Sequence, residues 1–275
     1  MHRLLLFAGD PALHDRLGSL LQRNDRTIED AYGGGEALER LRGERYDLVI
    51  AGPTNNGFDG MKLLRRLNSS HPETKVIVTD EPNPARAVAA IRAHAYGYLH
   101  TPPPPGPLME IVQAALDSSS WRHDLKIISA RPDWVTVDVR GKMEAAERAT
   151  HLLREWVVGL PASACEDVTA AFRELLMNGI EHGCRLNERK RVRATLIRTS
   201  RAIMVHLQDP GKGFARESIT HAAINNPDNS PTRHVEIRAE QGQRPGGFGI
   251  LMASHLVDEL LYNERGNEVF FVKHL

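Results

Sequence analysis

The stretch Arg173–Gly183, RELLMNGIEHG, places three polar residues, Glu174, Asn178 and His182, at intervals of four. Residues four apart lie above one another on one face of an α-helix. An apolar stripe follows the same helical spacing and comprises Val168, Phe172, Leu175 and Leu176. Upstream, Ser163–Glu166 has the S-x-x-E spacing of a capping box and predicts the start of the helix. A polar row beside a buried stripe is typical of a helix lining a polar cleft, although an ordinary solvated face fits this stretch equally well.

Two glycine-containing motifs follow this helix. Asp209–Phe214, DPGKGF, comes directly after the strand-like run Ala202–Leu207, and Gly246–Met252, GGFGILM, opens a further helical pattern. Glycines allow a tight turn and a close approach of the backbone to a ligand. At the start of a helix they also present backbone amides to anions. Taken singly, the first motif is more typical of an Asp-Pro-Gly turn between strands, and the second of a plain loop.

In this order, the three motifs resemble the N, G1 and G2 boxes of the GHKL ATPase superfamily, and most closely its anti-sigma-factor serine kinase branch. The resemblance covers residues 125–275 and implies an α/β two-layer sandwich that binds ATP and Mg²⁺. It implies that Asp209 hydrogen-bonds the adenine amino group and that Asn178 is a Mg²⁺ ligand. Glu174 then orients or deprotonates the attacking hydroxyl group.

The same resemblance assigns further residues to the nucleotide site. His182 is expected to contact phosphate or to pack, and the remaining cofactor-binding positions are Gly211, Gly213, Gly246, Gly247 and Gly249. The stretch 215–245 occupies the position of an ATP lid. Candidate phosphate cations in or beside it are Lys212, Arg238 and Arg244. One position departs from the family, because Asn267 follows Gly266 where a Thr or Ser is usual.

The first 118 residues alternate short apolar runs with helical segments. Strands are predicted at 4–7, 27–31, 48–51, 76–78 and 98–99, and helices at 11–23, 35–43, 58–69, 84–95 and 107–117. Five β-α repeats predict a doubly wound sheet of parallel strands in the flavodoxin-like order.

This half resembles the receiver domain of response regulators in its frame but not in its chemistry. Ala8-Gly9 replaces the acidic pair, Gly52 replaces the phosphoacceptor Asp, and Thr101 replaces the Lys before Pro102, a bond that the resemblance implies is cis. Aspartyl phosphorylation needs a carboxylate nucleophile, a held Mg²⁺ and a cation. We therefore predict a pseudo-receiver that offers a docking or dimerisation surface. The neighbouring acids are expected to cap the first helix (Asp10) and to lie in a turn (Asp59).

The break in helical pattern at Asp117–Ser120 predicts three segments: a receiver-like domain at 1–118, a linker at 119–124 and an ATPase domain at 125–275. His151, in an amphipathic helix, is predicted to be a packed histidine and not a phosphorylated one. The 35 basic and 35 acidic residues cancel, which gives no electrostatic case for nucleic acid or a membrane surface. No apolar run approaches the ~20 residues that span a bilayer, so a soluble, cytoplasmic protein is expected.

Two classes of function fit this sequence. The first is a protein serine/threonine kinase that transfers the γ-phosphate of MgATP to a partner of the anti-sigma-factor-antagonist type. The second is a non-catalytic module, with or without ATP, that sequesters a sigma factor or another regulator. A GHKL hydrolase is a third and less favoured reading. The expected partner is a protein, and a homodimer is left open.

Overall fold

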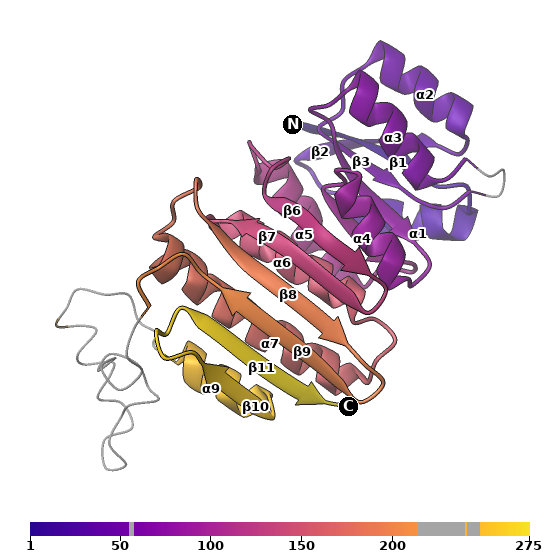
Figure 1. Cartoon of the computed structure of the whole chain (residues 1–275). Helices are drawn as coiled ribbons and strands as arrows, with labels where there is room; N and C mark the ends of the chain where they lie inside the picture. Colours follow the sequence, from indigo (N-terminus) through magenta and orange to yellow (C-terminus); the bar gives the residue numbers. More distant parts are fainter. Residues whose placement is uncertain (55–57, 214–239, 241–247) are drawn as a thin grey trace. The chain divides into compact units, whose positions relative to one another are not determined.

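The computed structural model describes residues 1–54, 58–213, 240 and 248–275. It divides into two compact units, which are shown in Figure 1. The first comprises Met1–Asp124 with His151–Val158, and the second comprises Leu125–Thr150 with Gly159–Leu275. The domain limits drawn from the sequence stay a prediction. In the part of the chain that is described, no helix has the length and apolar character needed to cross a bilayer.

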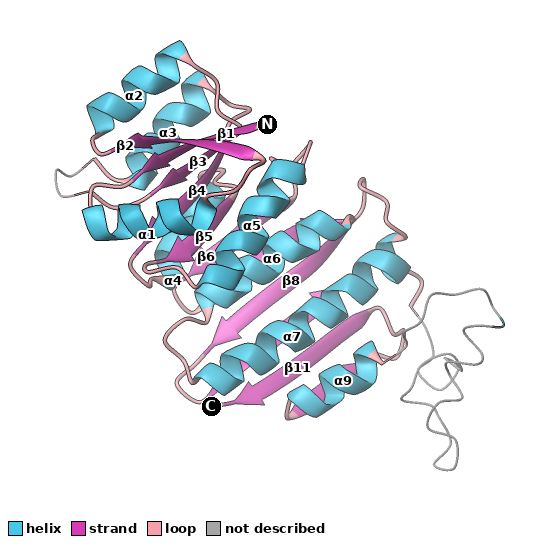
Figure 2. Ribbon diagram, turned by 180° about the vertical axis from the view of Figure 1, so that it is seen from behind, coloured by secondary structure: helices cyan, strands magenta, loops and turns pink. Residues whose placement is uncertain are grey.

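The first unit contains a parallel sheet in the order β2-β1-β3-β4-β5, as predicted. Its strands are β1 (His2–Phe7), β2 (Arg26–Ala31), β3 (Leu48–Ala51), β4 (Lys75–Asp80) and β5 (Gly97–His100). Its helices are α1 (Pro11–Leu21), α2 (Gly34–Gly43), α3 (Gly60–Ser70), α4 (Pro84–Arg92) and α5 (Pro105–Asp117). Helices α2, α3 and α4 lie on one face of the sheet and α1 and α5 on the other (Figures 1 and 2). The predicted doubly wound fold is therefore confirmed.

Local sequence explains where these helices begin. Asp10 caps α1 as predicted, since its carboxylate accepts a hydrogen bond of 3.0 Å from the Ala12 amide. The turn predicted at Asp59 is wrong: Asp59 caps α3 and accepts from the Lys62 amide at 2.9 Å. Helix α5 begins at Pro105, two residues earlier than predicted, because proline is well tolerated in a first helical turn. The Thr101–Pro102 bond is cis, as the receiver resemblance implies.

The second unit contains an antiparallel sheet in the order β10-β11-β9-β8-β7-β6. Its strands are β6 (Leu125–Arg131), β7 (Trp134–Arg140), β8 (Arg191–Arg198), β9 (Ala202–Gln208), β10 (Glu259–Tyr262) and β11 (Glu268–His274). The helices of this half of the chain are α6 (Met143–Trp156), α7 (Ala162–Asn178), the π-helix η1 (Gly179–Cys184) and α9 (Gly249–Leu256). Figure 2 shows α7 and α9 on the same face of the sheet, which makes the predicted two-layer sandwich.

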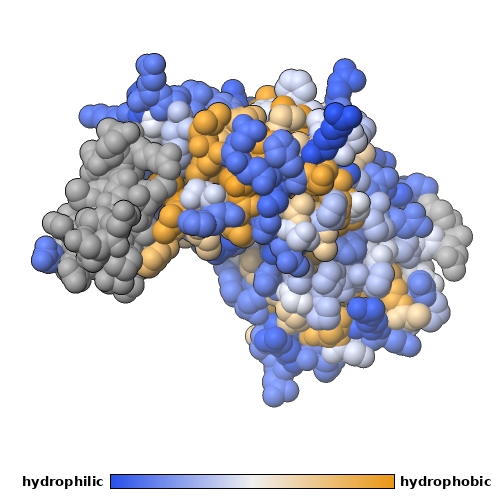
Figure 3. Space-filling model, turned by 90° about the horizontal axis from the view of Figure 1, so that it is seen from below, coloured by the Kyte–Doolittle hydropathy of each residue, from blue (hydrophilic) through white to orange (hydrophobic). Residues whose placement is uncertain are grey.

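The strand pattern explains which face of this sheet the helices cover. Along β9, Ile203, Val205 and Leu207 are buried while the residues between them are more exposed, as expected of a half-covered strand. On the helical layer Phe172 and Leu176 of α7 are fully buried. The side of the unit formed by α9 and β10 keeps exposed apolar side chains, and Figure 3 shows apolar surface there; they are Met252 and Leu261.

The start of α7 differs from the prediction. The helix begins at Ala162 with Pro161 as its N-cap, and no side chain caps it. Ser163 therefore already lies inside the first turn, where it cannot act as the N-cap of a capping box. The proposed capping box is wrong because the helix starts directly after the proline, whose extended backbone already ends the preceding segment.

Candidate functional site

Helix α7 places Glu174 and Asn178 one turn apart near its end, and both side chains are half-buried. The prediction of one α-helix through Gly183 is wrong, because the chain continues from Gly179 to Cys184 as a π-helix with i→i+5 hydrogen bonds. The argument from four-residue spacing therefore holds for Glu174 and Asn178 only. His182 lies within η1 and is exposed. Short π-helical segments of this kind occur frequently at functional sites.

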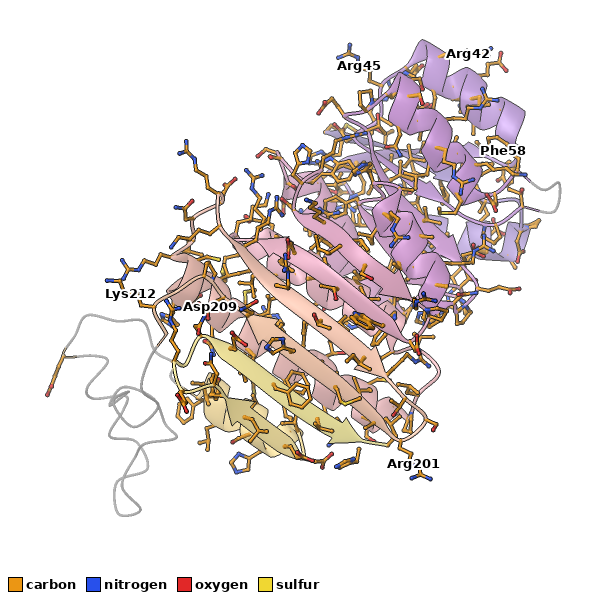
Figure 4. The ribbon with its side chains drawn as sticks, in the orientation of Figure 1. Arg42, Arg45, Phe58, Arg201, Asp209 and Lys212 are labelled. Carbon is orange, nitrogen blue, oxygen red and sulfur yellow. The ribbon has the colours of Figure 1, made fainter. Side chains whose placement is uncertain are left out.

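Asp209 follows β9 directly and its side chain is half-buried. Its Oδ1 accepts a hydrogen bond of 2.7 Å from the Gly211 amide. Gly183 of η1 lies against the same carboxylate, because a Cβ atom added at Gly183 would be 2.1 Å from Oδ1. A Cβ atom at Gly211 would be 2.6 Å from Oδ1. The structure therefore brings the first and second motifs together around one carboxylate, which Figure 4 shows beside Lys212 at the end of the sheet.

The pKa of Asp209 is raised, chiefly because burial disfavours the charged carboxylate. The Gly211 amide and the positive groups of Arg265, Lys190 and His182 oppose this shift. A half-buried carboxylate of this kind is a strong acceptor for a fixed hydrogen-bond donor on a ligand.

Gly249 is the first residue of α9 and lies against Glu174 and Asn178, the two predicted site residues on α7. A Cβ atom added at Gly249 would be 2.8 Å from Glu174 Oε2 and 3.7 Å from Asn178 Nδ2. The third motif therefore meets the first at the start of a helix, where backbone amides favour anions. Gly246, Gly247, Arg238, Arg244 and the predicted lid lie outside the described residues.

Glu174 has a basic neighbour that the sequence analysis did not single out. Arg173 Nη1 lies 3.6 Å from Glu174 Oε1, and Arg173 Nε donates to the carboxylate of Glu147 on α6 at 3.1 Å. The side chain of Glu174 is 29% exposed, so it remains accessible to a substrate. An i, i+1 pair is not a helix-face pair, and no spacing rule would have predicted this contact.

The turn between β10 and β11 completes the surroundings of Asp209. Asn267, at the position where the family usually has a hydroxyl, donates from Nδ2 to the main-chain oxygen of Asp209 at 3.1 Å. Gly213 has φ +76°, a conformation that suits glycine, and a Cβ atom there would collide with the Arg265 carbonyl oxygen. Sequence reasoning did not find Arg265, because it donates to main-chain oxygens of a distant segment, or Asn263, because it acts through Asn267 of the same turn.

These residues fit a nucleotide and its metal ion. Gly183 and Gly211 pack directly against Asp209 Oδ1, and among the described residues no donor is bonded to Oδ2, which leaves that oxygen able to accept from the edge of a planar base. Among the described residues, no group of three or more His, Cys, Asp or Glu could hold a metal ion. Asn178 alone suits Mg²⁺, which takes most of its oxygen ligands from phosphates and water.

The equivalent positions of the first unit also lie together, but without carboxylates. A Cβ atom added at Gly52 would be 3.1 Å from the Cβ of Ala8 and 3.2 Å from Thr79 Oγ1. Thr79 is buried, and its hydroxyl has no hydrogen-bond partner. The nearby acid Asp59 caps α3 and pairs with Arg86 at 3.3 Å. The frame of a phosphorylation site is present, and its nucleophile is absent.

Each half of the chain matches the model of a known protein family. Residues 5–113 match the response regulator receiver domain, and residues 139–273 match the histidine kinase-like ATPase domain. The chain is thus a receiver domain joined to an ATPase domain of the GHKL type. This pairing is that of a regulatory signalling protein.

Individual relatives resemble the first half. The response regulator MprA of Mycobacterium ulcerans is 31% identical over 101 residues, which is 36% of this chain and 44% of MprA. The nitrogen assimilation regulatory protein NtrX of Azorhizobium caulinodans is 25% identical over 128 residues, 46% of this chain and 28% of that protein. The chain thus spans less than half the length of either relative. The crystal structure of the receiver domain of NtrX from Brucella abortus matches with a TM-score of 0.40 and 24% identity, over 42% of this chain and 99% of that one.

Proposed function

We propose that the second domain binds MgATP and acts as a protein serine/threonine kinase on a partner of the anti-sigma-factor-antagonist type. The observation that carries this proposal is the meeting of the three motifs around the end of α7. Gly183 and Gly211 lie against Asp209, and Gly249 lies against Glu174 and Asn178. These contacts support the proposed roles of Asp209 with the base, Asn178 with the metal ion and Glu174 with the attacking hydroxyl group.

Each residue has a role that follows from its position. Asp209 accepts a hydrogen bond from the adenine amino group through Oδ2, since Oδ1 already accepts from Gly211. Asn178 would offer its amide oxygen to Mg²⁺, which would neutralise charge on the phosphates, while ATP itself would supply the phosphoryl group. Glu174 accepts the proton of the attacking serine or threonine hydroxyl while that oxygen bonds to the γ-phosphorus and the bond to ADP breaks. The amides at the start of α9 stabilise negative charge nearby.

A hydroxyl acceptor on another protein is favoured over a histidine of this chain. His151, the histidine that invites comparison with a phosphorylated one, is 8% exposed. Burial lowers its pKa to about 4, and its Nδ1 has no hydrogen-bond partner. The prediction of a packed histidine is confirmed, and a group so enclosed is a poor phosphate acceptor.

The second candidate is a module that sequesters a sigma factor or another regulator without catalysis. Asn267 favours it, because this side chain stands in place of the hydroxyl that helps to hold adenine in the family. In this case ATP is a structural ligand or is not bound. The pseudo-receiver then serves as a docking surface for a protein partner in either candidate.

The deciding experiment measures MgATP binding by calorimetry for the native chain and for Asp209→Asn. Loss of a charge-assisted hydrogen bond is expected to weaken binding at least about tenfold. Asp133→Asn is the matched control, since Asp133 is exposed in the turn between β6 and β7. A native chain that binds no MgATP contradicts the kinase proposal and favours the sequestering module. Transfer of γ-label to serine or threonine of an antagonist-type protein then separates a kinase from an ATP-binding module.

A further inference from the structure

The turn between β10 and β11 is built around the loop that carries Asp209. We infer that this turn, Asn263–Asn267, fixes the Asp209 carboxylate in position and thereby determines how strongly the pocket selects adenine over other purines. The inference rests on the proposed nucleotide site and assigns positioning roles to Asn263, Arg265 and Asn267.

Asn267 holds the main chain of Asp209 through its own carbonyl oxygen and its side-chain nitrogen Nδ2. The Asp209 amide donates to the Asn267 carbonyl oxygen at 3.0 Å, and Asn267 Nδ2 donates to the Asp209 carbonyl oxygen at 3.1 Å. Asn267 is itself buried, so these bonds are shielded from competing water. The backbone of Asp209 is therefore fixed by one residue of the neighbouring turn.

Asn263 fixes Asn267 in turn. Asn263 Nδ2 donates to Asn267 Oδ1 at 3.1 Å, and Asn263 Oδ1 accepts from the Asn267 amide at the same distance. The main chain of Asn263 also accepts from the Gly266 amide at 3.0 Å. Asn263 bonds to Asn267 and not to Asp209, so its effect on the carboxylate passes through Asn267.

Arg265 fixes the segment that follows Asp209. Its guanidinium donates to the carbonyl oxygens of Gly211 and Lys212, at 3.3 Å each. Gly213 lies on the Arg265 carbonyl oxygen so closely that no side chain would fit between them. Because the Gly211 amide in turn holds Asp209 Oδ1, Arg265 acts on the orientation of that carboxylate.

The consequence concerns the free oxygen of Asp209. Gly183 and Gly211 pack against Oδ1, and among the described residues no donor is bonded to Oδ2. Asp209 Oδ1 is thus occupied by the Gly211 amide, while Oδ2 is held in a fixed position where a ligand could donate to it. A carboxylate in this state accepts from the 6-amino group of adenine and has no donor for the 6-oxo group of hypoxanthine.

This arrangement and the family resemblance predict opposite effects for one substitution. Asn267→Thr restores the hydroxyl usual in the family, which on that ground should strengthen ATP binding. In this structure Asn267 uses two separate atoms, Nδ2 and Oδ1, to reach Asp209 and Asn263. A single hydroxyl cannot replace both bonds, so weaker binding is expected instead.

The test compares MgATP and MgITP binding by calorimetry for the native chain, Asn267→Thr, Asn263→Ala and Arg265→Ala. MgATP affinity is expected to fall about tenfold in the two asparagine variants while MgITP affinity changes less than about twofold. Arg265→Ala is expected to accelerate hydrogen exchange at the amides of Gly211–Gly213, measured without nucleotide. Glu264→Gln, exposed in the same turn, is the control and should change neither readout.

Three outcomes overturn the inference. Equal losses for the two nucleotides would mean that the turn only supports the fold. Tighter MgATP binding by Asn267→Thr would mean that a hydroxyl group at this position, as is usual in the family, holds adenine better than the two bonds of the Asn267 side chain. Unchanged hydrogen exchange in Arg265→Ala would mean that the turn does not hold the loop. The proposed function is judged separately, by whether the native chain binds MgATP at all.

Discussion

Each half of this chain brings together residues from several segments at the position expected of a functional site. The two halves differ in the side chains found at that position. In the first unit Ala8, Gly52 and Thr79 converge at the ends of parallel strands, and none of them is ionisable. In the second unit Glu174, Asn178 and Asp209 converge with glycines between them. The difference shows that a fold can keep the geometry of a site after its chemistry has gone, because function depends on side chains.

A glycine lies at each of the two sites, but for different reasons. Gly52 stands where a nucleophile is expected, and a Cβ atom there would be in tight contact with Ala8 Cβ at 3.1 Å and Thr79 Oγ1 at 3.2 Å. Gly183 stands beside the carboxylate predicted to bind the base, and a side chain there would overlap Asp209. A matched pair of glycine substitutions therefore tests the comparison directly.

Gly183→Ala is expected to have the largest effect on nucleotide binding. The added Cβ atom would lie 2.1 Å from Asp209 Oδ1 and 2.3 Å from Cγ, so the carboxylate must leave its place. MgATP affinity should fall more than about 100-fold, since both the base contact and the shape of the pocket are lost. Calorimetry measures the affinity, and circular dichroism checks that the variant is folded.

Gly52→Ala is the counterpart in the first unit and should leave MgATP affinity unchanged. Its Cβ atom would lie 3.1 Å from Ala8 Cβ, which small shifts can relieve. Gly35→Ala, with open space around the added atom, controls for the substitution itself. A binding loss in Gly52→Ala as large as that in Gly183→Ala would contradict the separation drawn between the two sites.

Glu174→Gln should lower phosphate transfer by about 100-fold or more, because removal of a general base typically costs this much. MgATP affinity is expected to stay within about threefold, since Glu174 contacts the acceptor and not the base. Transfer to an antagonist-type protein and calorimetry are measured on the same preparation. Glu166→Gln, an exposed carboxylate on the same helix, is the control. Transfer that persists at the native rate would remove the role of Glu174.

The two halves also differ in what their sequence could predict. The central strands of the first unit are apolar runs buried on both faces, such as Leu4–Phe7 and Leu48–Ala51, and prolines and Asp10 mark helix starts. The motifs of the second unit gave Glu174, Asn178 and Asp209 by resemblance, and their roles remain predictions. The capping box failed because the N-cap of α7 is Pro161, two residues before Ser163.

What the sequence could not reveal depends on contacts between distant segments. The π-helix after Asn178 brings Gly183 against Asp209, and no local propensity indicates that change of hydrogen bonding. Arg265 donates to main-chain oxygens more than fifty residues away, and Asn267, which Asn263 holds, donates to the main chain of Asp209. Such residues look like ordinary turn and surface residues in a single sequence.

Acidification should destabilise the first unit through His151, which belongs to it. Burial lowers the pKa of His151 from 6.5 to about 4, so the unfolded chain binds a proton more readily than the native one. Stability from this group is present above pH 6.5 and is lost as the pH falls toward 4, by about 2 kcal/mol at pH 5. Urea denaturation at pH 7.5 and pH 5 measures it.

His151→Gln should lose part of this pH dependence, while His255→Gln, an exposed histidine on α9, should retain it. Arg154 adds to the shift and Glu110 opposes it, so Glu110→Gln should lower the pKa of His151 further. An identical pH dependence in native chain and His151→Gln would show that the buried histidine is not the group responsible.

The smallest effect is expected for a substitution that puts an aspartate back at position 52, because this change alone should not restore phosphorylation. Gly52→Asp restores the residue type of a phosphoacceptor, yet no label from a small phosphodonor such as acetyl phosphate should appear on it. The new carboxylate would lie among Ala8, Thr79 and the Phe7 carbonyl oxygen, without a metal-holding acid or a cation. Burying it unpaired should also lower stability by about 1–3 kcal/mol, measured by urea denaturation.

Restoring the acidic pair as well is obstructed by the backbone. A Cβ atom at Gly9 would lie 2.9 Å from the Cα of Thr54, and a main-chain atom cannot move aside as a flexible side chain does. Label on Gly52→Asp would therefore contradict the pseudo-receiver reading, whereas its absence in a folded variant supports it. The first unit has then lost its chemistry in two ways, by replacement of the carboxylates and by closure of the chain over one of their positions.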